Sequence, residues 1–175
     1  MRNDLLIESP SVIDINKKDK FGSCYLVDKN QPMSIHKAVE QLAYYFKREG
    51  AFDFVQYTAN EDRHNKNSKA YIWIDTDWDD TFAVGACEFR FLGDVDQIKD
   101  WSLQWVWMHP YYRCKGLLTQ AWPHFIKQYG KDFHCAPPLS GEMECFLKKM
   151  NHKFQHCECP DEKNADVLPT GVQKK

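Results

Sequence analysis

The stretch WSLQWVWMHPYYRCKGLL (Trp101–Leu118) decides the fold of this 175-residue chain, because it joins an extended pattern directly to a helical one. Its first half, Trp101–His109, is apolar at neighbouring positions, which is typical of a strand with both faces buried at the centre of a sheet. From Leu117 to Tyr129 apolar side chains recur at helical spacing, and Gly130 ends that pattern. A buried strand that leads into an amphipathic helix predicts a mixed α/β layer fold.

The turn inside this stretch carries cations, whereas turns are usually built from Asn, Asp, Gly and Pro. Arg113, Lys115 and Gly116 stand where the helix begins. A helix N-terminus has unpaired N–H groups and the positive end of the helix dipole, so diphosphate binds well there. Gly116 lets the backbone approach a ligand closely. The turn therefore predicts an anion cradle; the alternative is an ordinary turn with solvated cations.

Composition limits the classes of protein to consider. The chain is 43% hydrophobic and 14% aromatic, which argues against disorder, and its net charge of −2 suggests no nucleic-acid partner. No apolar run approaches the ~20 residues that a membrane span needs. Seven scattered cysteines suit reduced thiols in a cytoplasm better than a disulfide framework. We expect one domain over residues 1–175, with flexible ends at 1–20 and 160–175.

The remaining pattern alternates strands and helices. Strands are expected at 23–28, 52–58, 70–76, 81–92 and 132–136, and the third and fourth of these form a hairpin. One helix is expected from a cap at Ser34 to Glu49, and another begins at a cap at Ser140. This order predicts a mostly antiparallel central sheet flanked by helices.

Residues 70–154 resemble the GCN5-related N-acetyltransferase (GNAT) superfamily. The family pattern is a strand followed by Arg/Gln-x-x-Gly-x-Gly/Ala at a helix start, and here it reads Arg113-Cys114-Lys115-Gly116-Leu117-Leu118, with Leu118 in place of the small residue. The segment APPLSGEMECFLKKMNHKF (136–154) is similar to the family's closing strand and helix. The strand, basic turn and helix also look like those of the cohesin acetyltransferases.

This resemblance implies acetyl-CoA as a co-substrate, with no metal, and an amine acceptor that is a small molecule or a peptide. Backbone groups of Trp107 and Met108 would pair with the pantetheine, and Ser140 would contact the cofactor. The diphosphate would be held by the amides of the turn, namely Arg113, Cys114, Lys115, Gly116, Leu117 and Leu118.

The family's reaction is direct attack of an amine on the thioester, which needs a base for the ammonium proton. Glu88 is one candidate, and strand alternation places it on one face with Val84, Ala86 and Arg90. A half-buried carboxylate there has a raised pKa if it is unpaired; the alternative is an ion pair with Arg90.

Gln104 and His109, both on the central strand, are the other candidates. Gln104 can position a water, and His109 titrates in the right range unless it simply ends the strand. The Tyr that the family uses as an acid for the leaving thiolate is replaced by Leu147. Either another group or solvent serves as the acid, or the protein is not a typical enzyme.

Three further features have a structural and a functional interpretation. Cys135 is a thiol nucleophile or a small core residue. His152, His156, Cys157 and Cys159 are zinc-type ligands at a non-standard spacing, so we do not expect a metal site. The turn DTDWDD (Asp75–Asp80), with Trp78 at its centre, would attract a cationic amine.

The preferred interpretation is an acetyl-CoA-dependent N-acetyltransferase. A CoA-binding regulator without turnover is the first alternative, because the family's Tyr is missing. A binding module with no cofactor is the second, supported by Leu118 and by Pro123 inside the helix.

Overall fold

The computed structural model describes residues 7–12, 14–15, 20–60, 67–77, 80–93 and 101–154. These residues form one sheet in the order β1-β2-β3-β4-β5-β6. Every neighbouring pair is antiparallel except β5 and β6, which run parallel. The strands are β1 (Lys20–Phe21), β2 (Cys24–Val27), β3 (Ser68–Asp77), β4 (Asp80–Phe91), β5 (Trp101–Met108) and β6 (His134–Cys135). The predicted mixed α/β fold with a mostly antiparallel sheet is confirmed.

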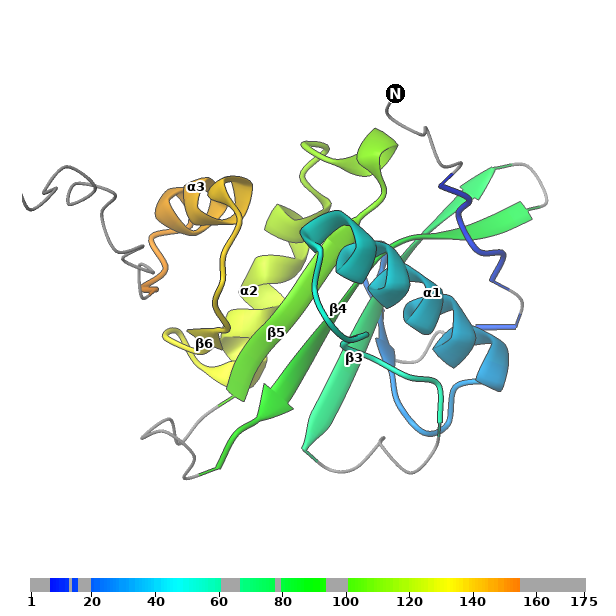
Figure 1. Cartoon of the computed structure of the whole chain (residues 1–175), viewed down its shortest axis with the longest axis horizontal. Helices are drawn as coiled ribbons and strands as arrows, with labels where there is room; N and C mark the ends of the chain where they lie inside the picture. Colours follow the sequence, from blue (N-terminus) through cyan, green and yellow to red (C-terminus); the bar gives the residue numbers. More distant parts are fainter. Residues whose placement is uncertain are drawn as a thin grey trace, which may run out of the picture.

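Helices cover both faces of the sheet (Figure 1). The helix α1 (Met33–Gly50) lies across one face, and α2 (Leu117–Tyr129) lies on the other. A short 3-10 helix (Pro110–Tyr112) precedes α2, and α3 (Gly141–Lys149) follows β6. No helix in the described part of the chain combines the length and apolarity that crossing a membrane requires.

Each face has its own hydrophobic core. The core under α1 joins Ile35, Val39 and Leu42 to small and aromatic residues of β3, β4 and β5. The core under α2 is mainly aromatic, and Phe125 lies at its centre, in ring contact with neighbours from three strands and from α2 itself: Phe21, Tyr71, Trp73, Phe89 and Trp122. Burial of these two faces fixes which side of each strand points toward which helix.

The loop after α1 differs from the prediction, because residues 52–58 form no strand. In the sheet, β2 pairs directly with β3, so no strand edge is available between them for residues 52–58. The loop packs near α1 instead. Tyr57 is buried and hydrogen-bonds His36 of α1 across 2.8 Å, while Phe54 stays 64% exposed. The helix itself begins after Pro32, so Ser34 lies in its first turn and is not its cap.

Residues near the N-terminus also depart from the expected irregular end. Ser11 bridges to Phe82, the amide of Val12 donates to Thr81, and Pro10 accepts from Ala83. These residues therefore run antiparallel to the first part of β4, in the stretch of β4 that lies beyond the end of β5. The C-terminal end at 160–175 lies outside the described residues.

Two irregularities in strand pairing set the direction of key side chains. The β3–β4 register passes from Trp73–Gly85 to Ile74–Ala83 and so skips Val84. A bulge of this kind adds one residue and reverses the alternation beyond it. Val84 consequently faces the α2 core, while Ala86 faces the α1 core, and the expected shared face of Val84 and Glu88 is wrong.

A first prediction concerns the α2 core. Replacing Phe125, which is fully buried, by Ala should lower the free energy of unfolding by about 3–5 kcal/mol, because a cavity opens among aromatic rings. The matched change Phe54→Ala removes the same ring from an exposed position and should cost less than about 0.5 kcal/mol. Urea denaturation of both variants measures the difference. Equal losses would mean that the core is not organised around Phe125.

Candidate active site

The central feature of the site is the divergence of β5 from β6. The two strands pair at Ser102–His134 and Leu103–Cys135, and the amide of Ala136 donates to the Leu103 carbonyl across 2.9 Å. Beyond that bond the rest of β5 has no strand partner on this side among the described residues. The β4–β5 register skips Gln104, so a bulge lies at the point where the strands separate.

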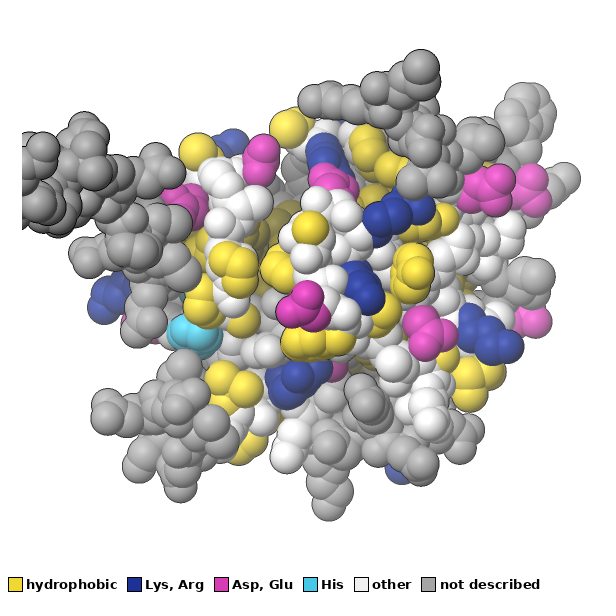
Figure 2. All heavy atoms as spheres, in the orientation of Figure 1, with side chains coloured by type: hydrophobic (Ala, Val, Ile, Leu, Met, Phe, Trp, Pro, Cys, Tyr) yellow, Lys and Arg dark blue, Asp and Glu magenta, His cyan; other side chains and the backbone are white. Residues whose placement is uncertain are grey.

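A pocket of about 310 Å³ opens at this point. It is enclosed by the end of α1 and its following loop, by the bulge of β5, and by the segment that leaves β6. Figure 2 shows this face hollowed between the segment that leads into α3 and the loop after α1, with hydrophobic side chains around the hollow. The lining residues are Phe46, Ala51, Phe52, Asp53, Phe54, Gln56, Gln104, Ala136, Pro137 and Pro138.

The turn from β5 to α2 presents a row of unused backbone amides. Cys114 and Gly116 both have positive φ angles, 59° and 80°, and they turn the chain sharply before α2. No amide from residue 114 to residue 119 donates to a group of the described chain, and the helix ladder begins with Gln120 donating to Gly116. A Cβ at Gly116 would meet nothing within 4 Å, so the space beside it is open. This concave row of donors suits an anion with several oxygens.

The structure changes the predicted role of one amide in this row. The amide of Arg113 donates to Pro110 across 3.3 Å and closes the 3-10 helix. The row of unused amides therefore begins at Cys114 and not at Arg113. Leu117 and Leu118 pack against the α2 core, so the larger Leu118 side chain turns inward and away from the row of amides.

The two cations of the turn are held by neighbours. The Arg113 guanidinium donates to Glu49 Oε2 at 2.6 Å and to the Met108 carbonyl at 3.0 Å, and it lies over the Trp107 ring. The Lys115 ammonium lies over the Tyr112 ring, 4.7 Å from its centroid. Because both contacts leave part of each cation exposed, both charges remain beside the row of amides.

Glu49, at the end of α1, connects the pocket loop to the turn. Its carboxylate accepts from Arg113 and also from Trp107 Nε1 at 2.8 Å. The hydrogen bond from Arg113 is the main cause that holds the pKa of Glu49 below its usual value. Across the opening, the pKa of Glu142 in the first turn of α3 is lowered by its own backbone amide and by Ser140, with a smaller contribution from Arg113.

The predicted cofactor contacts Trp107 and Met108 direct their backbone groups to opposite sides of β5. The amide of His109 donates to Val84 on β4, so alternation directs the backbone groups of Trp107 to β4 and those of Met108 to the open side. The Met108 carbonyl already accepts from Arg113, so Met108 can meet a ligand through its backbone amide, whereas the backbone of Trp107 is directed to β4. Ser140 caps α3 by accepting from the Met143 amide at 3.2 Å.

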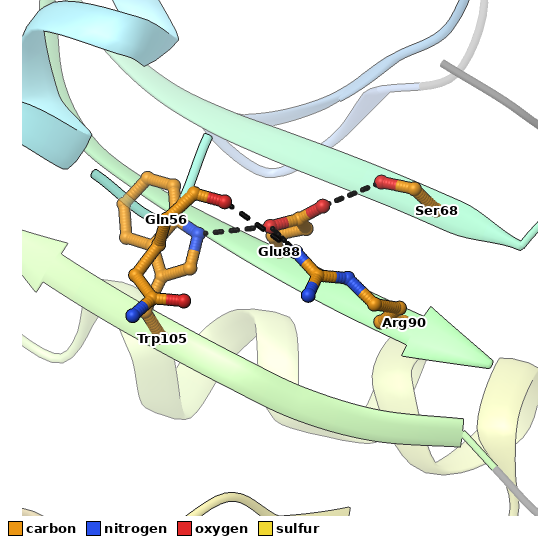
Figure 3. Close-up of polar contacts among 5 residues, drawn as sticks. All are labelled: Gln56, Ser68, Glu88, Arg90 and Trp105. Atoms are coloured by element: carbon orange, nitrogen blue, oxygen red, sulfur yellow. Dashed lines mark hydrogen bonds and ion pairs between the residues drawn. The ribbon is translucent and has the colours of Figure 1, made fainter. Parts of the chain in front are cut away.

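Glu88 lies in a closed polar network behind the pocket (Figure 3). It is 3% exposed; Oε1 accepts from Ser68 at 2.6 Å, and Oε2 accepts from Arg90 and Trp105, each at 3.2 Å. Arg90 also reaches the Gln56 carbonyl at 3.4 Å, and Gln56 lines the pocket. The ion pair with Arg90, one of the two interpretations of Glu88, is confirmed. Glu88 is thus connected to two lining residues, to Gln56 through Arg90 and to Phe46 through Trp105.

The remaining base candidates differ in access. Gln104 lines the pocket at the bulge. His109 is 7% exposed, its Nε2 lies 3.1 Å from the Ile7 carbonyl, and its Nδ1 accepts from the Tyr111 amide at 3.3 Å. Both ring nitrogens of His109 therefore serve the fold and fit the neutral Nε2–H tautomer.

Several sequence features are structural. Leu147 is fully buried in the α2 core, and Cys135 is a core residue whose burial raises the pKa of its thiol to about 12. Within the described residues no three potential ligands gather for a metal; His152 is buried against Phe133, while His156, Cys157 and Cys159 lie outside those residues.

The acidic turn is far from the pocket. Asp75 accepts from the Tyr112 hydroxyl at 2.7 Å, near the turn that leads to α2, and Trp78 and Asp79 lie outside the described residues. The path from the pocket to the turn runs along β5 from Gln104 to Met108, which pairs with Gly85, and then along β4 from Gly85 to Asp80. Its length is about 30 Å. The described ends of this turn, Asp75 and Asp80, are therefore not part of the pocket.

The sequence prediction missed Asp53 and Glu49. Asp53 stands in FDF (52–54), which begins two residues after Gly50, the end of α1. A carboxylate between two aromatics just after a helix stop is the signal that could have found it. Glu49 looked like an ordinary residue in the last turn of a helix. Its role depends on Trp107 and Arg113, far away in sequence, so local pattern carries no sign of it.

Comparison with solved structures gives the same architecture. The structure of the xEco2 acetyltransferase domain, bound to a CoA conjugate, superposes with a TM-score of 0.51 at 12% identity, over 73% of this chain and 86% of that one. A mutant of the BH1408 protein from Bacillus halodurans superposes with a TM-score of 0.52 at 9% identity, over 86% and 99%. The chain has the GNAT fold.

No family model and no curated protein matches the sequence. The GNAT fold is therefore recognised here through its backbone, at identities too low to transfer a substrate or a catalytic residue. The features of the site itself are the unused amides, the divergence of β5 from β6 and the pocket.

A second prediction concerns the Glu49–Arg113 pair. Because the pKa of Glu49 is lowered in the folded state, its contribution to stability is present above its usual value of 4.5 and is lost as the pH falls through the folded value. The side chains are 49% and 41% exposed, so the pair should contribute about 0.2–1 kcal/mol at pH 7. Urea denaturation between pH 3 and pH 7 measures it. In the Glu49→Gln variant, the free energy of unfolding should fall less steeply as the pH is lowered from 7 to 3.

A double-mutant cycle provides the control for that experiment. Arg113→Gln alone should reduce the pH dependence of the free energy of unfolding similarly. The double variant should be little less stable than either single variant. Strictly additive losses at pH 7 would contradict the pairing.

A third prediction separates a structural from a catalytic role of Glu88. Glu88→Gln should lower the free energy of unfolding by about 1–3 kcal/mol, because at least one buried donor loses its acceptor. Asp132→Asn, an exposed change in the turn after α2, is the control and should have almost no effect. Thermal and urea denaturation measure both. A Glu88→Gln variant as stable as the wild type would show that the network of Figure 3 is not a structural one.

Proposed function

We propose that this protein is an acetyl-CoA-dependent N-acetyltransferase that acts on an amine. The row of unused amides at residues 114–119, flanked by Arg113 and Lys115, is the observation that carries this proposal. A diphosphate is the ligand that fits such a row, because it offers several anionic oxygens to N–H donors at a helix start. From there, the open side of β5 leads to the pocket at Gln104.

Acetyl-CoA fits this surface as an extended ligand. The diphosphate would be bound by the amides of Cys114–Leu118 and by Lys115, and the backbone of Met108 would meet the pantetheine along β5. Four residues of strand, about 13 Å, separate Met108 from Gln104. The thioester would then lie at the bulge, where the pocket admits an amine. Ser140, at the start of α3, would contact the cofactor from that side.

The reaction needs little chemistry from the protein. The neutral amine attacks the thioester carbon, the C–S bond breaks, and CoA leaves as a thiolate while the nitrogen gives up a proton. Alignment of the two reactants in one pocket supplies much of the rate. Gln104 would hold the water that receives the proton, and Glu88 would act through Trp105 and Arg90 as a positioning residue. His109 would have to release Ile7 or Tyr111 before it could act as a base.

A catalytically silent CoA-binding protein is the second candidate. The observation that favours it is Leu147, which is fully buried where the resemblance places a Tyr acid. In that case CoA binds the same amides and the pocket serves for recognition. In an enzyme, solvent at the open side of β5 would protonate the thiolate.

We also propose a cytoplasmic location and a single functional domain. All five cysteines in the described part of the chain are free thiols, which suits a reducing compartment.

A fourth prediction tests the cradle. Titration calorimetry with acetyl-CoA should show binding, and Lys115→Glu should weaken it by at least about tenfold, because a charge-assisted contact becomes a repulsion. Lys127→Glu, near the other end of α2, is the matched control and should leave the affinity unchanged. No binding of acetyl-CoA at millimolar concentration would overturn the proposed function.

Turnover separates the two candidates. Release of free CoA thiol, followed with a thiol reagent during incubation with a panel of amines, identifies an enzyme. Binding of acetyl-CoA without thiol release for any amine that occupies the pocket would identify the silent alternative.

A further inference from the structure

The chemistry of the pocket indicates what kind of amine it accepts. Its volume of about 310 Å³ is at the lower end of the range for small-molecule sites. A compact ligand of about ten non-hydrogen atoms fits such a volume better than a folded protein surface does. The question is which groups on that ligand the lining residues would recognise.

Most of the lining is aromatic or apolar. Phe46 and Phe52 stack with ring centroids 4.8 Å apart, and Phe46 also packs on Trp105, which the Glu88 network holds in place. Phe54 contributes to the lining and is 64% exposed, which is costly for so large an apolar ring unless something covers it. An aromatic ring that enters the pocket would meet the stacked rings and Pro137, which all belong to the lining.

The charge of the pocket is negative. Asp53 is the charged residue among the described lining residues, and it makes no hydrogen bond or ion pair within the described chain. Arg90, whose guanidinium reaches Gln56 from behind, is already paired with Glu88. The carboxylate of Asp53 therefore has no cation partner among the described residues, and a ligand ammonium would supply one. A ligand carboxylate would find no cation in the lining.

We propose that the acceptor is a small primary amine with an aromatic body and no carboxylate, of the arylalkylamine type. Asp53 binds its ammonium, and Phe46, Phe52 and Phe54 hold its ring. This proposal rests on the proposed function, since it names the substrate class of the same site. A ligand ring in the pocket would also cover Phe54, whose side chain is 64% exposed.

Four matched probes test the recognition directly on the full-length protein. Phenethylamine carries both recognised groups; n-butylamine lacks the ring; phenylalanine adds a carboxylate; hydrocinnamate replaces the amine by a carboxylate. Binding is measured by calorimetry and by saturation-transfer NMR, with and without saturating CoA. Phenethylamine should bind at least about tenfold more tightly than each of the other three.

Variants assign the binding to the pocket. Asp53→Asn and Phe54→Ala should each weaken phenethylamine binding by at least about fivefold and leave acetyl-CoA affinity within about twofold. Asp132→Asn, which lies outside the pocket lining, is the control and should change neither. Phe54→Leu should recover part of the affinity, because it restores apolar contact without the ring.

The outcomes distinguish this inference from the proposed function. Acetyl-CoA binding with no phenethylamine binding in either condition, or with n-butylamine or phenylalanine bound equally well, overturns the inference and leaves the acetyltransferase proposal intact. Phenethylamine binding that depends on Asp53, without any acetyl-CoA binding, supports the pocket assignment and overturns the acetyltransferase. A lysine-containing peptide that binds more tightly than phenethylamine would also overturn the inference in favour of a peptide acceptor.

Discussion

The pocket opens where the pairing of β5 with β6 stops. In the described structure, the last backbone hydrogen bond of this pairing runs from the amide of Ala136, one residue after β6, to the Leu103 carbonyl. A third residue pair after Ser102–His134 and Leu103–Cys135 would continue the pairing along β5 into the region where the pocket lies. Instead, the bulge at Gln104 turns β5 away at that point, and Pro137 and Pro138 follow on the other strand. Proline cannot donate to a ladder, so the separation is built into the sequence after β6.

The two proposed binding surfaces at this opening differ in charge: one would bind an anion and the other a cation. Unused amides and two cations gather at the start of α2, while Asp53 lies at the pocket. Glu49 connects them, because it holds Arg113 and lies in the same helix end that leads into the pocket loop. Binding at the cradle would compete with Glu49 for Arg113, so the two ends of the site are not electrostatically independent.

The functional carboxylates differ in what they can do, and burial is the reason. Glu88 is held by three donors in the interior and stabilises the pocket walls. Asp53 is exposed and has no partner in the described chain, so its charge is available to a ligand. Glu88 is identified as a candidate from the sequence, and Asp53 is missed. A carboxylate in the middle of an apolar strand is unusual, whereas a carboxylate in a loop is common.

The sequence by itself determined the elements that periodicity encodes: the helix from Leu117, the hairpin of β3 and β4, the central strand, and the turn with Arg113, Lys115 and Gly116. These follow from local pattern because side-chain spacing matches backbone geometry. Tertiary structure decided the rest. The bulges at Val84 and Gln104, which reverse side-chain alternation, arise from pairing with neighbouring strands. Residues 52–58 form no strand because the order of the sheet leaves them no edge to pair with. The Glu49–Arg113 contact joins residues that are far apart in the sequence. Such features depend on which segments meet in space, which local pattern does not encode.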